Sequence, residues 1–319
     1  MVTATPTVAP RRADEGASAW LLLWRRLRRK KIAMVALAAI IIFYFVGISA
    51  HWIAPYSPTA IDLDRPLEGP SADHWLGTDR IGRDMLSRVM YSARTTVIIT
   101  TTVILSGSIL IGNGLGLLAG YKGGAIDNVI MRIGDAFAGL PALVMLVLIN
   151  ATLGPRVTEF VRWIEDNSFL DNLVQSGFPS YLLVGVTFSL FFWVGTARII
   201  RSQVLQLRER DFIMAAESLG ARPQRIIISH LLPNVSFLII LAISTGLGAI
   251  AGSELVLTWF GVGVQPPTAS FGAMIFDGSG ARTFQAHPHL LLVPGFFVTM
   301  LLFGFSLFGD ALNDAVRSR

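Results

Sequence analysis

Apolar residues are grouped along this chain in six long runs, separated by segments that carry most of the charges. The first run, Ile32 to about Ile53, is long enough as a helix to cross the roughly 30 Å hydrocarbon core of a bilayer, at about 1.5 Å per residue. The other five are expected near Thr95–Leu118, Val129–Asn150, Ser180–Ile200, Val235–Trp259 and His289–Gly309. Helices satisfy their own backbone hydrogen bonds in lipid. The pattern therefore predicts an all-α polytopic membrane protein with six transmembrane helices.

The composition agrees with a protein embedded in a lipid bilayer. Of its 319 residues, 53% are hydrophobic and 15% charged, whereas soluble domains carry about 25% charged residues. The net charge is +5, but the basic residues cluster beside the apolar runs, which is typical of membrane topology and not of nucleic-acid binding. The chain has no cysteine, which excludes disulfides, a thiolate metal site and a cysteine nucleophile. We predict no metal site.

Residues 1–31 are predicted to form a cytoplasmic tail followed by an interfacial helix. The segment Trp20 to Lys31 sets Trp and Leu against six cations, as in helices that lie among anionic headgroups. A secretory signal peptide is the alternative, but the run from Ile32 is too long for its apolar region and no small-residue cleavage site follows. The positive charge then places the amino terminus in the cytoplasm, and six spans return the carboxyl terminus to the same side.

The polar segment from Asp211 to Asn234 has the punctuation of two short helices joined by a bend. Asp211 is expected to cap the first helix, Gly220 to end it in the left-handed conformation, and Pro233 to end the second. Four apolar residues share one face of the first helix: Phe212, Ala215, Ala216 and Leu219. The predicted topology places this loop in the cytoplasm.

This segment resembles the E-A-A loop of ATP-binding cassette importer permeases. Ala215-Ala216, Gly220 and Leu232-Pro233 stand in its register, whereas Met214 replaces the leading Glu and His230 replaces an Ile. In that family the loop docks into a groove on the ATPase subunit; an amphipathic interfacial hairpin is the alternative. The resemblance implies an ATPase-coupling surface composed of Asp211, Phe212, Met214, Ala215, Ala216, Glu217, Leu219, Gly220 and Pro233.

Three further runs resemble the branch of these permeases that serves dipeptides, oligopeptides and nickel. They are HWLGTDRIGRDMLSR (His74 to Arg88), GYKGGAIDNVIMRIGDAFAGLP (Gly120 to Pro141) and WFGVGVQPPTASFGAMI (Trp259 to Ile275). In the first run, we expect a structural cluster in which two arginines pair with two carboxylates, with direct substrate contact as the alternative: Arg83, Arg88, Asp79 and Asp84. In the second, Arg132 and Asp135 are spaced to pair.

Small residues recur every four positions in two spans, a spacing that lets helix backbones approach closely. The first stripe is Gly112, Gly116 and Gly120; the second is Ser244, Gly248 and Gly252, which we expect to pair with a partner subunit. The glycines of the first stripe are not a phosphate loop, because no Lys-Ser/Thr pair follows and no strand precedes them. No segment matches that motif, so any ATP must be held by another polypeptide.

Glu254 and an external loop are two further candidates. An ionisable residue near the outer end of a span is a functional candidate, and a structural partnership of Glu254 with backbone of the following loop is the alternative. We expect Gly154 to Pro179 to form an external loop with a short amphipathic helix on the outer surface. That helix would either line the dock for a substrate-binding protein or seal the bundle.

Together these features predict a permease subunit of an ATP-driven importer of di- or oligopeptides, in the inner membrane of a prokaryote. Residues 1–31 form the tail and interfacial helix, 32–94 the first span and an external loop, and 95–319 the core with the coupling loop at 211–234. The resemblance implies a second permease, two ATPase subunits or domains and an extracytoplasmic binding protein. The chain is expected to be no enzyme and to hold no cofactor, with ATP and Mg on the ATPase partners. The alternative is an ion- or proton-coupled secondary transporter that uses Glu254.

Overall fold

The computed structural model describes residues 19–169 and 171–317, so the tail predicted for residues 1–18 lies outside the described part. Within it, the helices are α1 (Ala19–Arg29), α2 (Lys31–Ile53), α3 (Met85–Val103), η1 (Ile104–Asn113), α4 (Gly114–Lys122), α5 (Gly124–Gly139), α6 (Ala142–Asp166), α7 (Phe178–Arg208), α8 (Asp211–Ser218), α9 (Pro223–Arg225), η2 (Ile226–Leu231), α10 (Leu232–Trp259), α11 (Phe271–Gly278), α12 (Ala281–Ala286) and α13 (His289–Arg317). Both η segments are π-helical.

Six helical segments in the described ranges are long and apolar enough to cross a membrane, which confirms the predicted fold class. They are Lys31–Ile53, Met85–Lys122, Ala142–Asp166, Phe178–Arg208, Pro223–Trp259 and His289–Ala315. The second is formed by α3, η1 and α4 in continuous sequence, and the fifth by α9, η2 and α10.

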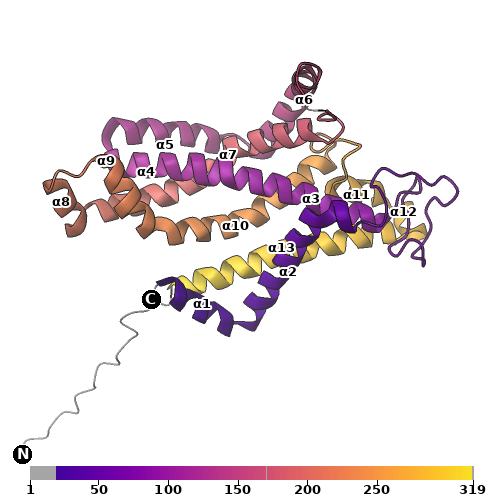
Figure 1. Ribbon diagram of the computed structural model, residues 1–319, viewed down its shortest axis with the longest axis horizontal. Coiled ribbons are helices and arrows are strands. Elements are labelled where there is room, and N and C mark those ends of the chain that lie inside the picture. The colour runs from indigo at the N-terminus through magenta and orange to yellow at the C-terminus, as the bar shows by residue number, and fades with distance from the viewer. Residues whose placement is uncertain (1–18, 170, 318–319) are drawn as a thin grey trace, which may run out of the picture.

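Helices α4, α7, α10 and α13 run in broadly the same direction and give the molecule two distinct ends, whereas α6 is seen nearly end-on (Figure 1). One end, which we call the α8 end, carries α8 and α9. The opposite end, the loop end, carries α11, α12 and the segment 54–84 between α2 and α3. Helix α1 packs on the carboxyl-terminal part of α13, where Leu27 is buried against Leu312 and Lys30 pairs with Asp314 at 2.9 Å.

Two predicted span boundaries are wrong. The second span begins at Met85 and not near Thr95, because Asp84 caps it: the carboxylate accepts a hydrogen bond from the Ser87 amide at 2.7 Å. The predicted span Val129–Asn150 crosses a break between α5 and α6 at Leu140-Pro141. Proline disfavours the helical conformation of the residue before it, and Leu140 is extended (φ −86°, ψ 141°).

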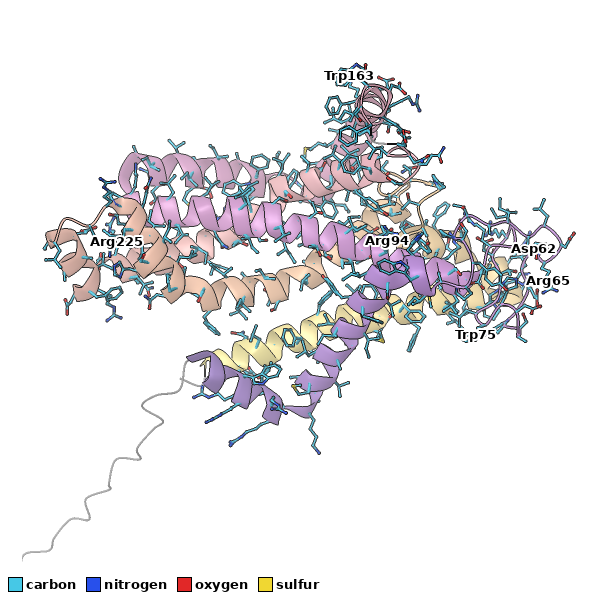
Figure 2. The ribbon with its side chains drawn as sticks, in the orientation of Figure 1. Asp62, Arg65, Trp75, Arg94, Trp163 and Arg225 are labelled. Carbon is cyan, nitrogen blue, oxygen red and sulfur yellow. The ribbon has the colours of Figure 1, made fainter. Side chains whose placement is uncertain are left out.

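The external loop predicted from Gly154 to Pro179 is also wrong in its first half. Helix α6 continues through Pro155 to Asp166, so the amphipathic segment is the end of a spanning helix and not a separate one. Figure 2 shows Trp163 on the outside of α6, where its ring stacks on Phe160 with centroids 6.3 Å apart. The connection that follows folds back on α6, since the Glu165 carboxylate accepts from two amides at 3.0 Å, those of Asn172 and Val174.

The glycines of the first small-residue stripe lie against α7. A Cβ atom at Gly116 would stand 2.8 Å from the carbonyl oxygen of Ala197. Cβ atoms at Gly112 and Gly120 would lie 2.9 Å and 2.7 Å from the nearest atoms of α7. The second stripe lies against α13 of the same chain. A Cβ at Gly248 would lie 3.4 Å from Phe305, and one at Gly252 3.8 Å from Leu302, so α13 occupies the face that we expected a partner subunit to cover.

We predict that Gly116→Ala lowers the thermal stability of the detergent-solubilised protein. The new methyl meets backbone that cannot rotate away, and overpacking of this kind typically costs about 1–3 kcal/mol. Gly114 is the matched control, because nothing lies within 4 Å of a Cβ there. Gly114→Ala should be neutral or stabilise by up to about 1 kcal/mol through helix propensity. Equal melting temperatures for the two variants would contradict this account of the α4–α7 contact.

Candidate functional site

Helix α8 is attached to the bundle through one apolar side chain and leaves others uncovered. Ile213 is fully buried and belongs to the cluster that contains Ile226 and Leu231. Phe212 is exposed, and Leu219, the residue after the helix, is 88% exposed. The predicted set did not include Ile213, whose burial depends on residues of η2 that follow it in the chain.

Gly220 forms the predicted bend. Its φ is +77°, and its amide donates to the Glu217 carbonyl at 2.9 Å while the Ala221 amide donates to the Ala216 carbonyl at 3.0 Å. These two bonds are the Schellman pattern, which satisfies the last carbonyls of a helix and favours glycine at this position.

Two other predictions about this segment are wrong. Asp211 does not cap α8 but is its first residue, while Arg210 occupies the cap position and makes no side-chain cap bond. The Asp211 carboxylate still lies in the first turn, where negative charge is favourable. Pro233 does not end the second helix, which runs on from Pro223 to Trp259. The π-helical segment Ile226–Leu231 ends two residues before Pro233 and accommodates the missing amide donor.

The remaining predicted coupling residues differ in their surroundings. Met214 and Ala215 are exposed, whereas Ala216 is half-buried at the edge of the apolar face. Glu217 accepts a hydrogen bond from the Tyr121 hydroxyl at 3.3 Å, which links α8 to α4, and the Phe212 ring lies 6.5 Å from that of His230. The result is a helix held on one side with apolar side chains exposed on the other.

Two ion pairs connect α5 to α7 in the half of the bundle nearer the α8 end. Asp127 accepts from the Arg201 guanidinium, with Nη2 to Oδ2 at 2.6 Å, and Asp135 pairs with Arg198 at 2.8 Å. The predicted pair between Arg132 and Asp135 is therefore wrong, because α7 presents an arginine to the same carboxylate.

At the loop end, a buried ion cluster joins three segments. Asp79 is 2% exposed and binds Arg83 at 2.6 Å and Arg88 at 2.5 Å, and Arg88 also meets Asp277 of α11 at 3.3 Å. The structural cluster predicted around Asp79 is confirmed. The expectation that Asp84 pairs with an arginine is wrong, since its partner is His74 Nδ1 at 3.0 Å.

Glu254 is 1% exposed and links three parts of the fold. Its carboxylate accepts from Thr258 Oγ1 at 3.1 Å in its own helix and from Thr96 Oγ1 at 3.4 Å in α3. Thr258 in turn accepts from the Val264 amide at 3.1 Å, in the loop that follows α10. This geometry supports the structural partnership with the following loop.

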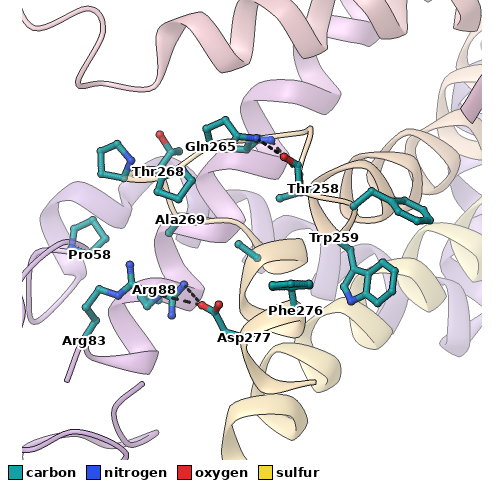
Figure 3. Close-up of a pocket in the computed structure, with 16 residues that line it drawn as sticks. Pro58, Arg83, Arg88, Thr258, Trp259, Gln265, Thr268, Ala269, Phe276 and Asp277 are labelled. Carbon is teal, nitrogen blue, oxygen red and sulfur yellow. Dashed lines mark hydrogen bonds and ion pairs between the residues drawn. The ribbon is translucent and has the colours of Figure 1, made fainter. Parts of the chain in front are cut away.

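A cavity of about 330 Å³ opens beside that loop (Figure 3). Arg83, Arg88 and Asp277 form one wall, and Trp259 and Phe276 contribute apolar surface on another. The cavity therefore combines charged groups with apolar ones, at the end of the bundle opposite α8.

Comparison with known proteins decides the family. The family model described as the inner membrane component of binding-protein-dependent transport systems matches residues 112–319. The chain belongs to this permease family. Its amino-terminal part adds a second match, because residues 18–70 fit the N-terminal transmembrane domain of oligopeptide transport permease C. As a member of this family with six spanning helices, this permease is a multi-pass inner-membrane transport component.

Several curated relatives cover nearly the whole permease. The dipeptide transport system permease DppC of Bacillus subtilis (strain 168) is 33% identical over 92% of this chain and 83% of its own length. The oligopeptide transport system permease OppC of the same organism is 31% identical over 93% and 90%. The glutathione transport system permease GsiD of Escherichia coli O157:H7 is 32% identical over 99% and 95%.

For Glu254 we predict that Glu254→Gln leaves transport nearly intact, because an amide can still accept from Thr258 and bond to Thr96. Glu254→Leu leaves those hydroxyls without their acceptor, at a cost of about 1–3 kcal/mol in folding stability. Uptake measured against pH, together with thermal unfolding, tests both variants. Inactivity of the Gln variant, with loss of the wild-type pH dependence, would show that Glu254 carries protons or cations.

Proposed function

We propose that this permease forms half of the translocation pathway of an ATP-driven importer of di- or oligopeptides. Family membership and the names of the relatives support this assignment. The other half would be a second permease subunit, with two ATPase subunits or domains that bind ATP and Mg, and an extracytoplasmic binding protein that delivers the substrate. The chain itself would hydrolyse nothing and hold no cofactor.

We further propose that the α8 end faces the cytoplasm of a prokaryotic cell and the loop end faces outwards. The approach to α8 and the loop itself carry many arginines, as cytoplasmic loops do: Arg198, Arg201, Arg208, Arg210, Arg222 and Arg225. The ends of α1 and α13 lie together, which is consistent with both termini on the cytoplasmic side.

The single observation that supports coupling best is the uncovered apolar surface of α8. Phe212, Met214 and Leu219 are all more than 40% exposed on an element that Ile213 holds firmly to the bundle. Burial of each large apolar side chain against another protein would contribute about 1.5–3 kcal/mol. A groove on an ATPase subunit fits this surface, and movement of that subunit would then be transmitted to α10 through the bend at Gly220.

A secondary transporter driven by ions or protons is not favoured. Such proteins depend on intramembrane ionisable groups that take up and release their cargo. Both carboxylate oxygens of Glu254 are instead engaged by hydroxyl groups that fix a loop. The family match points to the same conclusion.

We predict that Leu219→Asp uncouples the importer without unfolding this chain. Because Leu219 is 88% exposed, its replacement removes little from the isolated subunit. It should weaken ATPase association about 10- to 100-fold, the equivalent of one buried leucine. Copurification of the ATPase subunits and peptide uptake by the reconstituted transporter measure the effect. Ser218→Ala, an exposed neighbour, is the matched control and should behave as wild type. Normal coupling in Leu219→Asp would refute the docking role of this surface.

A further inference from the structure

A second, smaller cavity adjoins the one beside the loop after α10. It measures about 210 Å³ and is lined mostly by polar side chains. Helix α3 contributes Tyr91, Arg94 and Thr95, α7 contributes Tyr181, and the connection before α7 contributes Ser176. In Figure 2, Arg94 lies nearer the middle of the molecule than Asp62, Arg65 and Trp75, which lie at the tip of the loop end.

Arg94 differs from the other arginines of α3 and its approach. Arg83 and Arg88 are both paired with Asp79. Arg94 is half-buried, yet among the described residues no carboxylate lies within ion-pair distance of it and its side chain makes no hydrogen bond. A charge that is partly withdrawn from water without a partner is unfavourable. Its position in a polar cavity is explained if an anionic ligand completes the site.

The walls around Arg94 are held in place by hydrogen bonds. Thr95 Oγ1 donates to the Ala269 carbonyl at 2.7 Å and lies 3.2 Å from the Tyr181 hydroxyl. These contacts tie α3 to α7 and to the loop before α11. The cavity therefore has a fixed shape, and it contains the Arg94 guanidinium, which has no partner among the described residues.

We propose that Arg94 binds the C-terminal carboxylate of the transported peptide. A guanidinium offers a planar pair of donors that matches a carboxylate in bidentate geometry. The terminal carboxylate is common to all unmodified peptides, so this contact selects peptides as a class and ignores their side chains. The inference rests on the proposed function, because it identifies a substrate contact of that importer.

The neighbouring cavity favours a free peptide over an acidic side chain of a docked protein. The two cavities share a wall of four residues: Pro58, Pro267, Thr268 and Ala269. Beyond that wall lie the apolar rings of Trp259 and Phe276, together with Asp277, which Arg88 already engages at 3.3 Å. A ligand with a carboxylate at one end and an adjoining side chain that can enter the apolar part suits this pair of cavities, whereas a single protruding carboxylate would use only one of them.

Cysteine labelling tests the carboxylate contact directly. The chain has no native cysteine, and Ser176 is exposed at the cavity. In the complete transporter with Ser176→Cys, an anionic methanethiosulfonate should label the cysteine faster than a cationic one. Arg94→Gln should reduce that preference about tenfold, as expected for a focused local charge. Trialanine should slow the labelling when Arg94 is present, whereas trialanine amide, which lacks the carboxylate, should not.

Reconstituted transport provides the second readout. We expect Arg94→Gln to lower trialanine uptake at least about tenfold, the loss of one charge-assisted contact, and Arg94→Lys to retain part of it. Arg282→Gln, an exposed arginine at the same end, is the matched control and should transport normally. The melting temperature of the complex should not fall in Arg94→Gln, because an unpaired charge is being removed.

Three results would overturn the proposal. The first is equal protection by trialanine and its amide. The second is a marked fall in the melting temperature of Arg94→Gln, since Arg94 would then pair with another subunit. The third is a loss, in the Arg94→Gln complex without peptide, of the stimulation of ATP hydrolysis by the binding protein. The carboxylate that Arg94 binds would then belong to that protein. Failure of the proposed function gives a different result. The wild-type complex would then import no peptide at all, whatever the labelling experiment shows.

Discussion

A chain that crosses a bilayer must satisfy its own backbone hydrogen bonds, because the hydrocarbon core contains no water to do so. In this permease the requirement is met without interrupting the long helices. Helices α6 and α13 continue as α-helices through Pro155 and Pro294, and before Pro233 the helix changes to a π-helical turn and continues. The same change occurs at Ile104–Asn113, which lies along α7 at the centre of the bundle. Close glycine contacts there let the two backbones approach, and α10 packs against both of them.

Charged groups at both ends of the bundle are used mainly for structure. Asp127 and Asp135 connect α5 to α7, and Asp79 holds the segment before α3. Against this background, the apolar surface of α8 and the Arg94 cavity have no partner within the described part of the chain. They lie at opposite ends of the molecule, as the docking surface of an energy-supplying subunit and a substrate contact of an importer would.

The hydrophobic pattern predicted the number of spans, and the glycine at position 220 predicted the bend after α8, because both depend on local sequence. The break at Leu140-Pro141 was missed because apolar residues continue across it, although the proline marks it. Other features depend on distant partners. Asp135 pairs with Arg198, 63 positions away, so spacing within α5 favoured the wrong arginine. The burial of Ile213 likewise requires η2 to fold back beside α8. The state of Arg94 could not be inferred from the sequence, since it requires knowing which carboxylates are already paired.

The central claim is that α8 lies on the cytoplasmic side of the membrane, where an ATPase subunit can reach it. Single cysteines at Ser218 and Ala72, both exposed and at opposite ends of the bundle, test this in a chain without native cysteine. With an impermeant thiol reagent applied to intact cells, position 72 should be labelled, and position 218 only after the membrane is permeabilised. Labelling of position 218 in intact cells would contradict both the orientation and the coupling role of α8.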